Sequence, residues 1–388
     1  MGRIDDLIQQ YCPEGVDYVK LGDYCPVLRG KRLTKSQLSE EGKYKVFHGG
    51  IDPIGYYDQH NREANTAMVI NVGASAGTVG FSKEEFWSSD GCFCLQHNKD
   101  VNNQFLFYFL QTQEYLLKSR VRHAGIPTLD GQVIEKIEFP LPPLPIQEAI
   151  VEILDKFDRL SAELQAELQA RKQQYEYYRN QLLTRFAPEQ PVTEYSLGEL
   201  GTITRGNGLQ KKDFTESGVG CIHYGQIYTR YKTFTEKTLT YVDESLAKKL
   251  LHVEKGDLVI ACTSENVEDV CKCVAWLGED TIVTGGHACV YRHNQNPKYM
   301  AYFFQTDYFF QQKKKYAYGA KVIDIKPDSI AKITIPLPSL EEQARIVAIL
   351  DKFEALVNDL SQGLPAEIAA VQEQYEYYRN KLLTFKSA

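Results

Sequence analysis

The chain has 388 residues, 43% of them hydrophobic, which is enough for two or three folded domains. No apolar run approaches the roughly 20 residues of a membrane span, and residues 1–6 show no signal-peptide pattern, so we expect a cytoplasmic protein without membrane contact. The net charge of −7 argues against a uniformly basic nucleic-acid binder. The acidity is concentrated in residues 141–190 and 337–388, which hold 6 and 5 basic residues against 8 and 8 acidic ones.

Residues 1–143 predict a first β-rich domain. Short strands are expected at 67–72 and 91–96, and an aromatic, core-facing helix over about 102–118. The glycine-rich stretch at 73–80 lacks the Gly-Lys-Ser/Thr ending of a phosphate loop, so a tight turn is the favoured interpretation. A loop that approaches DNA through Ser75 and Thr78 is the alternative.

Basic side chains gather at two places in this domain. Phosphate contacts use Lys and Arg on loops, and base contacts use side chains that reach into a groove. A solvated surface charge remains the alternative interpretation for each of them. If this domain binds DNA, the predicted contacts are Arg29, Lys31, Arg32, Lys35, His48, Arg120 and Arg122.

Residues 144–188 predict a long helix after a proline-fixed, extended entry. Apolar residues recur with alternating spacings of four and three from Ile150 to Leu182, as in a coiled-coil seam, and only Ser161 and Arg171 interrupt them. The sequence Ala-Glu-Leu-Gln at 162–165 is repeated at once at 166–169. These residue types are good helix formers.

The same order then returns. Residues 189–338 predict a second domain, with strands at 258–262, 270–276 and 288–292 and a helix over about 297–314. Its landmarks echo the first domain, because Arg29-Gly30 recurs as Arg205-Gly206. If the second domain also binds DNA, the predicted contacts are Arg205, Asn207, Lys211, Lys212, Tyr224, Gln226, Lys313, Lys314, Lys315 and Lys321.

Residues 339–388 predict a second long helix, with a break beside Gly363 and Pro365. It repeats the first helical block closely: Ile-Leu-Asp-Lys-Phe stands at 153–157 and 349–353, and Gln-Tyr-Glu-Tyr-Tyr-Arg-Asn at 174–180 and 374–380. A chain of two half-molecules in tandem can imitate a two-fold dimer.

We therefore predict an α+β fold in which two long helices pair as an antiparallel coiled coil, separate and join two β-rich domains, and give the chain internal pseudo-two-fold symmetry. Separate packing of each helix on its own domain is the alternative. The repeated tyrosines 175, 178, 375 and 378 lie on the seam face. A second face can bind a partner protein, and the predicted partner contacts are Tyr177, Arg179, Tyr377 and Arg379.

The repeated blocks resemble those of the specificity subunits of type I restriction–modification systems. The Pro-Leu-Pro entries, the two shared motifs and the doubled Ala-Glu-Leu-Gln carry the resemblance, together with Tyr-Cys-Pro-Glu-Gly-Val at 11–16. The resemblance implies a non-catalytic reader of double-stranded DNA, with one target-recognition domain for each half of a split site. It further implies that the helices set the gap and dock two methyltransferase subunits, and that restriction subunits join the complex.

Elementary geometry agrees with this implication. Two halves with one scaffold and different surfaces predict an asymmetric, bipartite site, whereas identical halves predict a palindrome. One Ala-Glu-Leu-Gln unit adds about 40° of net rotation and about 6 Å to a helix. One base pair twists DNA by about 35°. We therefore hypothesise that the repeat is a spacer ruler.

The sequence disfavours two other protein classes. A methyltransferase or nuclease acting alone would need an Asn/Asp-Pro-Pro-Tyr motif or a Walker A sequence, and the chain has neither. A coiled-coil adaptor that does not read DNA would not need two folded domains. We expect no cofactor and no metal on this chain, with S-adenosylmethionine, ATP and Mg on partner subunits only. The Cys-x-Cys pairs 92/94 and 271/273 fit alternating strand residues better than a zinc site.

Overall fold

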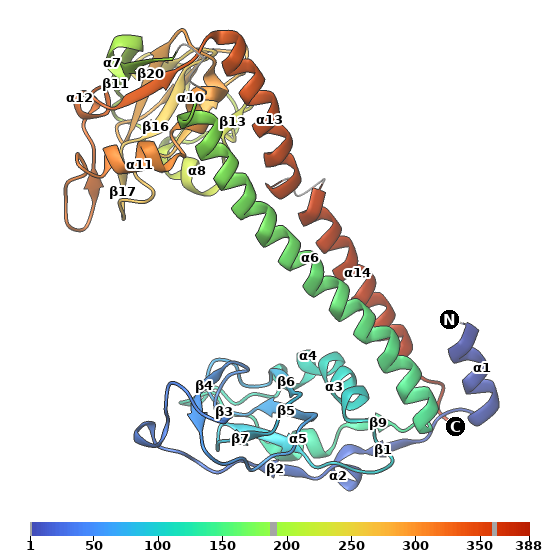
Figure 1. The fold of residues 1–388 in the computed structure, drawn as a ribbon. Coiled ribbons are helices and arrows are strands. Elements are labelled where there is room, and N and C mark those ends of the chain that lie inside the picture. Colours follow the sequence, from blue (N-terminus) through green and yellow to red (C-terminus); the bar gives the residue numbers. More distant parts are fainter. Residues whose placement is uncertain (1, 187–191, 359–362) are drawn as a thin grey trace. The chain divides into compact units, whose positions relative to one another are not determined.

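The computed structural model describes residues 2–186, 192–358 and 363–388. It divides into two compact units: Met1–Gln165 with Glu367–Ala388 form unit 1, and Ala166–Ala366 form unit 2. Helix α6 (Leu144–Thr184) is 41 residues long and supplies its first half to unit 1 and its second half to unit 2 (Figure 1). Among the described residues, no helix combines the length and the apolarity needed to cross a membrane.

Unit 1 contains a four-stranded sheet of order β2-β8-β5-β6 and a three-stranded sheet of order β4-β3-β7. Strand β5 is buried along its whole length, because α3 packs over it, which explains its continuous apolar sequence. The strands are β2 (Val27–Arg29), β3 (Tyr44–Phe47), β4 (Pro53–Tyr57), β5 (Thr66–Ile70), β6 (Val79–Ser82), β7 (Phe86–Ser88) and β8 (Cys92–Leu95).

Unit 2 repeats this plan with a five-stranded sheet of order β11-β20-β16-β18-β13 and a four-stranded sheet of order β14-β12-β19-β15. Both units also share a parallel pair, β3 with β7 and β12 with β19. The strands are β11 (Gly201–Arg205), β12 (Val219–Ile222), β13 (Phe234–Thr235), β14 (Thr240–Val242), β15 (Leu251–Val253), β16 (Leu258–Ala261), β18 (Cys273–Trp276), β19 (Ile282–Thr284) and β20 (Ala288–His293).

The predicted strands are all present, but each predicted aromatic helix is two short helices. In unit 1, α3 (Asn103–Thr112) and α4 (Glu114–Ser119) are separated at Gln113. In unit 2, α10 (Pro297–Phe303) is followed by α11 (Asp307–Lys313). The Thr306 side chain accepts a hydrogen bond from Phe309 N, so it starts a new helix where one continuous helix was expected.

Each unit also contains a pair of packed helices. In unit 1, Phe157 of α6 packs against Tyr378 of α14 (Gly363–Leu382), with ring centroids 5.7 Å apart. In unit 2, Tyr178 of α6 packs against Phe353 of α13 (Leu340–Asn358), also at 5.7 Å. In each pair, the phenylalanine near the start of one repeated block packs against the tyrosine near the end of the other block, as antiparallel pairing requires. The predicted α+β class with β-rich bodies and antiparallel helix pairs is confirmed.

The predicted break beside Gly363 and Pro365 coincides with the start of α14, and the seam residue Leu360 lies outside the described residues. The remaining elements of unit 1 are α1 (Gly2–Tyr11), β1 (Tyr18–Lys20), α2 (Leu21–Tyr24), a 3-10 turn (Lys35–Gln37), α5 (Gly131–Glu135) and β9 (Glu138–Pro140). Those of unit 2 are β10 (Thr193–Ser196), α7 (Leu197–Leu200), a 3-10 turn (Lys211–Asp213), α8 (Tyr224–Thr229), α9 (Glu244–Ala247), β17 (Thr263–Ser264), β21 (Ile323–Asp324), α12 (Pro327–Ile330) and β22 (Thr334–Leu337).

A buried glutamine ties each helix to its β-rich body. In unit 1, Gln147 Oε1 accepts from Asn102 N at 2.8 Å, and its Nε2 donates to Pro142 O at 2.7 Å. In unit 2, Gln343 accepts from Asn296 N at 3.1 Å in the same way. Asn102 and Asn296 are the N-caps of α3 and α10, so each glutamine fixes the start of an aromatic helix.

A tyrosine provides a second tie. Tyr108 of α3 donates to Asp155 at 2.6 Å and to Asp158 at 2.7 Å. Tyr302 of α10 donates to Asp351 at 2.8 Å and to Glu354 at 2.6 Å. Burial, and then these carboxylates, raise the pKa of both tyrosines, so their hydroxyls stay protonated as donors. We call the glutamine and tyrosine contacts together the helix clamp of each unit.

Candidate nucleic-acid interface

Backbone hydrogen bonds hold a set of loops together at one end of β5 in unit 1. Leu129 N donates to Asn71 O at 2.9 Å, and Asn71 N donates to Gly91 O at 3.2 Å. Ser89 N donates to Phe47 O at 3.0 Å. These bonds continue the sheets into the loops. We call this region the loop edge of unit 1, formed by residues 29–35, 48–50, 71–78, 89–91 and 120–130.

The structure brings both predicted basic clusters of unit 1 to this edge. Lys31 N donates to Ser88 O at 2.9 Å, which attaches the 29–35 loop. His48 Nδ1 lies 3.2 Å from Gly91 N and 3.3 Å from a carboxylate oxygen of Asp90. The predicted contacts with exposed side chains are Arg29, Lys31, Arg32, Lys35, Arg120 and Arg122.

The 73–80 stretch is a tight turn, as predicted. Ala76 N donates to Gly73 O at 3.1 Å and Thr78 N to Ser75 O at 3.0 Å. Gly73 and Gly77 both have positive φ, 87° and 88°, which only glycine adopts at little cost. The turn belongs to the loop edge.

Unit 2 has an equivalent loop edge. Ile325 N donates to Cys262 O at 3.1 Å, and Cys262 N donates to His287 O at 2.9 Å. At this edge, Cys262, directly after β16, forms a disulfide with Cys289 of the neighbouring strand β20. The loop edge of unit 2 consists of residues 205–212, 223–226, 262–272, 285–287 and 314–326.

Arg205 does not point freely outward from this edge. Its guanidinium donates to both carboxylate oxygens of Asp324, at 3.1 and 2.5 Å, and to Gly286 O at 3.0 Å. Burial opposes ionisation of Asp324, but the hydrogen bonds from Arg205 and Tyr318 outweigh it and lower the pKa of the carboxyl. Arg205 therefore fixes the loop that carries Asp324. Asp324 is absent from the predicted contacts, although its position as a carboxylate between lysines in the sequence could have indicated an ion pair at this edge.

The polar side chains predicted to contact bases in unit 2 differ in whether they are already engaged in contacts within the chain. Gln226 accepts from His223 N at 3.0 Å and donates to Thr240 at 3.2 Å, so it is engaged in capping α8. The Tyr224 ring packs against His287 with centroids 4.8 Å apart. The predicted contacts with exposed side chains are Asn207, Lys211 and Lys212.

The three consecutive lysines at 313–315 do not form one surface cluster. Lys313 is 4% exposed, and its ammonium donates to Glu268 O at 2.8 Å and to Val270 O at 2.5 Å. Burial lowers its pKa. The prediction that Lys313 contacts DNA is therefore wrong for this structure, because the side chain braces the 265–270 loop instead. Lys314, Lys315 and Lys321 are exposed.

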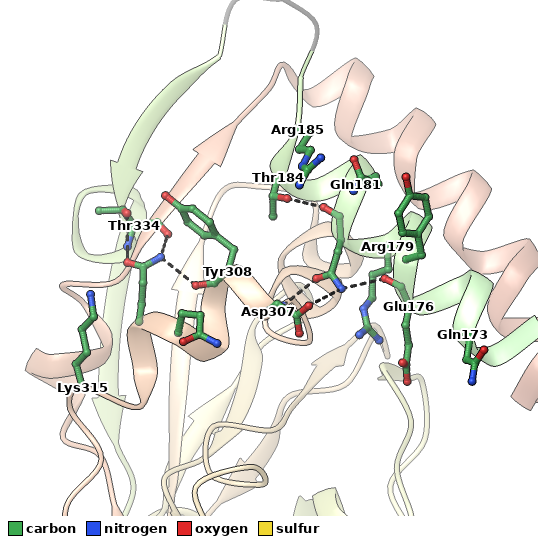
Figure 2. A pocket seen from close by; sticks show the side chains of 14 residues that line it. Gln173, Glu176, Arg179, Gln181, Thr184, Arg185, Asp307, Tyr308, Lys315 and Thr334 are labelled. Atoms are coloured by element: carbon green, nitrogen blue, oxygen red, sulfur yellow. Dashed lines mark hydrogen bonds between the residues drawn. The ribbon is translucent and has the colours of Figure 1, made fainter. Parts of the chain in front are cut away.

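The C-terminal end of α6 borders a cleft of about 1020 Å³ in unit 2 (Figure 2). Asn180 accepts from Asp307 N at 2.8 Å and so holds the start of α11. Arg179 packs over the Tyr175 ring at 5.3 Å and donates to Gln305 at 3.3 Å. Lys315 reaches the far wall of this cleft.

The corresponding cleft in unit 1 has a volume of about 300 Å³ and is lined by Asn380 and Thr384 of the repeated motif. Arg379 packs over Tyr375 at 5.2 Å, as its counterpart does in unit 2. Both arginines therefore contact their own chain, whereas Tyr177 and Tyr377 are each 59% exposed. Of the four predicted partner contacts, the two tyrosines present the larger free surfaces.

The model for the type I restriction–modification DNA specificity domain matches this chain twice, at residues 13–171 and 189–370. The chain belongs to the type I restriction–modification specificity subunits. Its two specificity domains each contain one of the loop edges. Membership places the chain among DNA-recognition subunits, and the predicted family resemblance is confirmed.

Relatives and solved structures agree. A putative type I specificity subunit of Haemophilus influenzae is 26% identical over 92% of both chains. The EcoR124I/EcoR124II specificity subunit of Escherichia coli is 34% identical over 65% of this chain and 63% of its own length. The crystal structure of an S subunit from M. genitalium has a similar fold, with a TM-score of 0.56 at 17% identity over 95% of this chain and 96% of that one.

A further structure, described as the basis of complex assembly and conformational transition of the type I system, matches with a TM-score of 0.61 and 17% identity over 96% of this chain and 98% of that one. The specificity subunit fold is thereby shown for this chain.

Proposed function

We propose that this specificity subunit reads a split, asymmetric site on double-stranded DNA, one half with each loop edge. The proposal is supported by a contrast: the helix clamps of the two units make the same contacts, whereas the loop edges carry different side chains. Gln147 and Gln343 make equivalent contacts in the two units. At the loop edges, by contrast, Arg205 is paired with Asp324 in unit 2, and the residue that corresponds to Asp324 in unit 1 is Thr128. Two edges with different side chains present different donors and acceptors to the bases.

The helices serve as the proposed docking surface for two methyltransferase subunits. Exposed Tyr177 and Tyr377 lie in identical sequence motifs, so they offer the same contact twice, and two equal contacts suit two copies of one partner. Restriction subunits would join this assembly. S-adenosylmethionine, ATP and Mg would be bound by the partner subunits, so this chain would recognise DNA without catalysing a reaction.

The doubled Ala-Glu-Leu-Gln is the proposed ruler for the gap between half-sites. Both copies, 162–165 and 166–169, are helical in α6. Deleting 162–165 should shorten the gap by one base pair and leave both half-sites unchanged. An unchanged gap in the methylated motif of the deletion variant would refute the ruler.

The deciding experiment for the whole proposal is single-molecule sequencing of adenine methylation in cells that make this chain with its cognate methyltransferase subunit. A split motif with a fixed gap, absent from cells without the chain, is the expected result. If no motif depends on the chain although both proteins are present and associated, the proposal fails and an adaptor role replaces it.

A further inference from the structure

Each loop edge contains a short hairpin of the same construction. In unit 1, Arg122 and Thr128 exchange two backbone hydrogen bonds of 2.9 and 3.0 Å. In unit 2, Tyr318 and Asp324 do the same at 3.1 and 2.9 Å. Five residues form the tip in both cases, 123–127 and 319–323. The two hairpins are therefore equivalent, although their tips share only one residue at a matching position, Ala124 with Ala320.

Both hairpins are held firmly at their base. Gly73 N donates to Pro127 O at 2.9 Å, and Thr128 pairs with Val72 at the end of β5. In unit 2, β21 pairs with β17, so Asp324 lies opposite Thr263. The Arg205–Asp324 ion pair adds a side-chain tie. Figure 1 shows the hairpin beside β17 standing away from the sheets of unit 2.

The tips present aliphatic side chains to solvent at the same position. Ile126 is 70% exposed and Val322 is 58% exposed, and each stands two residues before the end of its hairpin. Glycines with positive φ shape the two loops, Gly125 at 88° and Gly319 at 118°. A single exposed aliphatic residue is common on a protein surface, but the same kind of residue at the matching place of two equivalent hairpins indicates a shared role in binding.

The surroundings of the tips identify what covers them. Exposed basic side chains stand close in sequence to each aliphatic residue: Arg120 and Arg122 in unit 1, and Lys321 in unit 2. Positive charge beside an aliphatic tip suits DNA, where phosphates border a groove whose floor contains apolar surface.

We propose that Ile126 and Val322 are specificity-determining residues that enter a DNA groove and make apolar contact with base edges. The inference rests on the proposed function. Two kinds of contact share this chemistry: packing on a thymine methyl group in the major groove, and insertion between base steps in the minor groove. The flanking cations hold the phosphates, and the aliphatic tip supplies sequence preference without a hydrogen bond.

The test uses the complete complex with the methyltransferase and a duplex that carries the mapped motif. Ile126→Ser and Val322→Ser should each reduce discrimination between the motif and a duplex mismatched in one half by roughly tenfold. The affected half should differ between the two variants. The salt dependence of binding should not change, because neither variant removes a charge.

Matched controls separate this effect from general damage. Ile54→Ser and Leu239→Ser remove other exposed aliphatic residues, 47% and 52% exposed, and should preserve discrimination. Ile126→Val and Val322→Ile should retain most of it. Replacing thymine by uracil in the motif should weaken wild-type binding if the methyl contact is made, and 2-aminopurine should brighten if a base step is opened.

The outcomes are distinct. A wild-type complex without sequence preference would refute the proposed function. A wild-type complex with a motif that both serine variants read unchanged would refute only the role of the tips.

Discussion

The two units are most alike where the helix meets the body and least alike at the loop edges. Gln147 and Gln343 cap the aromatic helices in the same way, and Tyr108 and Tyr302 each bridge two carboxylates. At the loop edges, the Arg205–Asp324 ion pair of unit 2 corresponds to Arg29 and Thr128 in unit 1. The contrast shows which parts are fixed by folding, because a buried polar contact tolerates little change and an exposed loop tolerates much.

The strongest test of the equal clamps is the removal of each glutamine. Gln147→Ala and Gln343→Ala each leave buried backbone groups without a partner, so each should lower the free energy of unfolding by roughly 2–4 kcal/mol. Chemical denaturation of the two variants measures this. A large loss in one variant and none in the other would show that the clamps are not equivalent.

The exposed tyrosines test whether the docking surfaces are equal. Tyr177→Ala and Tyr377→Ala should each weaken binding of one methyltransferase copy by about 2 kcal/mol, because large aromatic side chains dominate interfaces. The double variant should lose both copies, as measured by the mass of the complex in solution. Tyr115→Ala removes an 88% exposed tyrosine outside the motif and is the control. Unchanged stoichiometry in the double variant would place the interface elsewhere.

The lysines at 313–315 separate a structural cation from DNA-binding cations within one segment. Lys314→Ala with Lys315→Ala should weaken DNA binding, reduce the salt slope by about 2 and preserve the motif, because each lysine neutralises about one phosphate. Lys313→Met should instead lower stability and leave the salt slope unchanged. A changed motif in the double variant would contradict a phosphate role.

The smallest expected effect concerns the ion pair. Asp324→Asn should destabilise unit 2 by about 1 kcal/mol, since the pair is partly exposed, and should speed hydrogen exchange in residues 318–324. The pKa of Asp324 is lowered, so its contribution is complete above the unfolded value of about 3.9 and is lost as pH falls through the folded value. A stability difference between wild type and variant that persists in strong acid would contradict this assignment.

The repeated blocks could be predicted from the sequence because their periodicity is strong. The seam through Ile150 and Leu154 is buried as expected, and its pairing with the second block follows from chain order. The split of each aromatic helix was missed; in unit 2 the Thr306 cap lies in a short polar segment, Gln305-Thr306-Asp307, between two aromatic runs that read as one helix. The family followed from motifs of seven and five identical residues, which chance does not produce.

The site was harder to predict because it depends on burial and on long-range pairing. Nothing in the sequence distinguishes Lys313 from its two neighbours, yet only the first is turned inward. The matching of Ile126 with Val322 is invisible until the hairpins are aligned by their hydrogen bonds, since neither residue nor neighbour is shared. The clamp residues Tyr108 and Gln147 recur as Tyr302 and Gln343 in the second half of the sequence, but their partners lie about 45 residues away.

The helix clamp has a consequence for inheritance. Since the polar contacts of the clamp, an N-cap asparagine, one tyrosine and a buried glutamine, are the same in both units, genetic recombination within the repeated blocks can exchange an entire body and still yield a folded protein. A population of cells thereby acquires a new half-site in a single crossover, without waiting for loop residues to mutate one at a time.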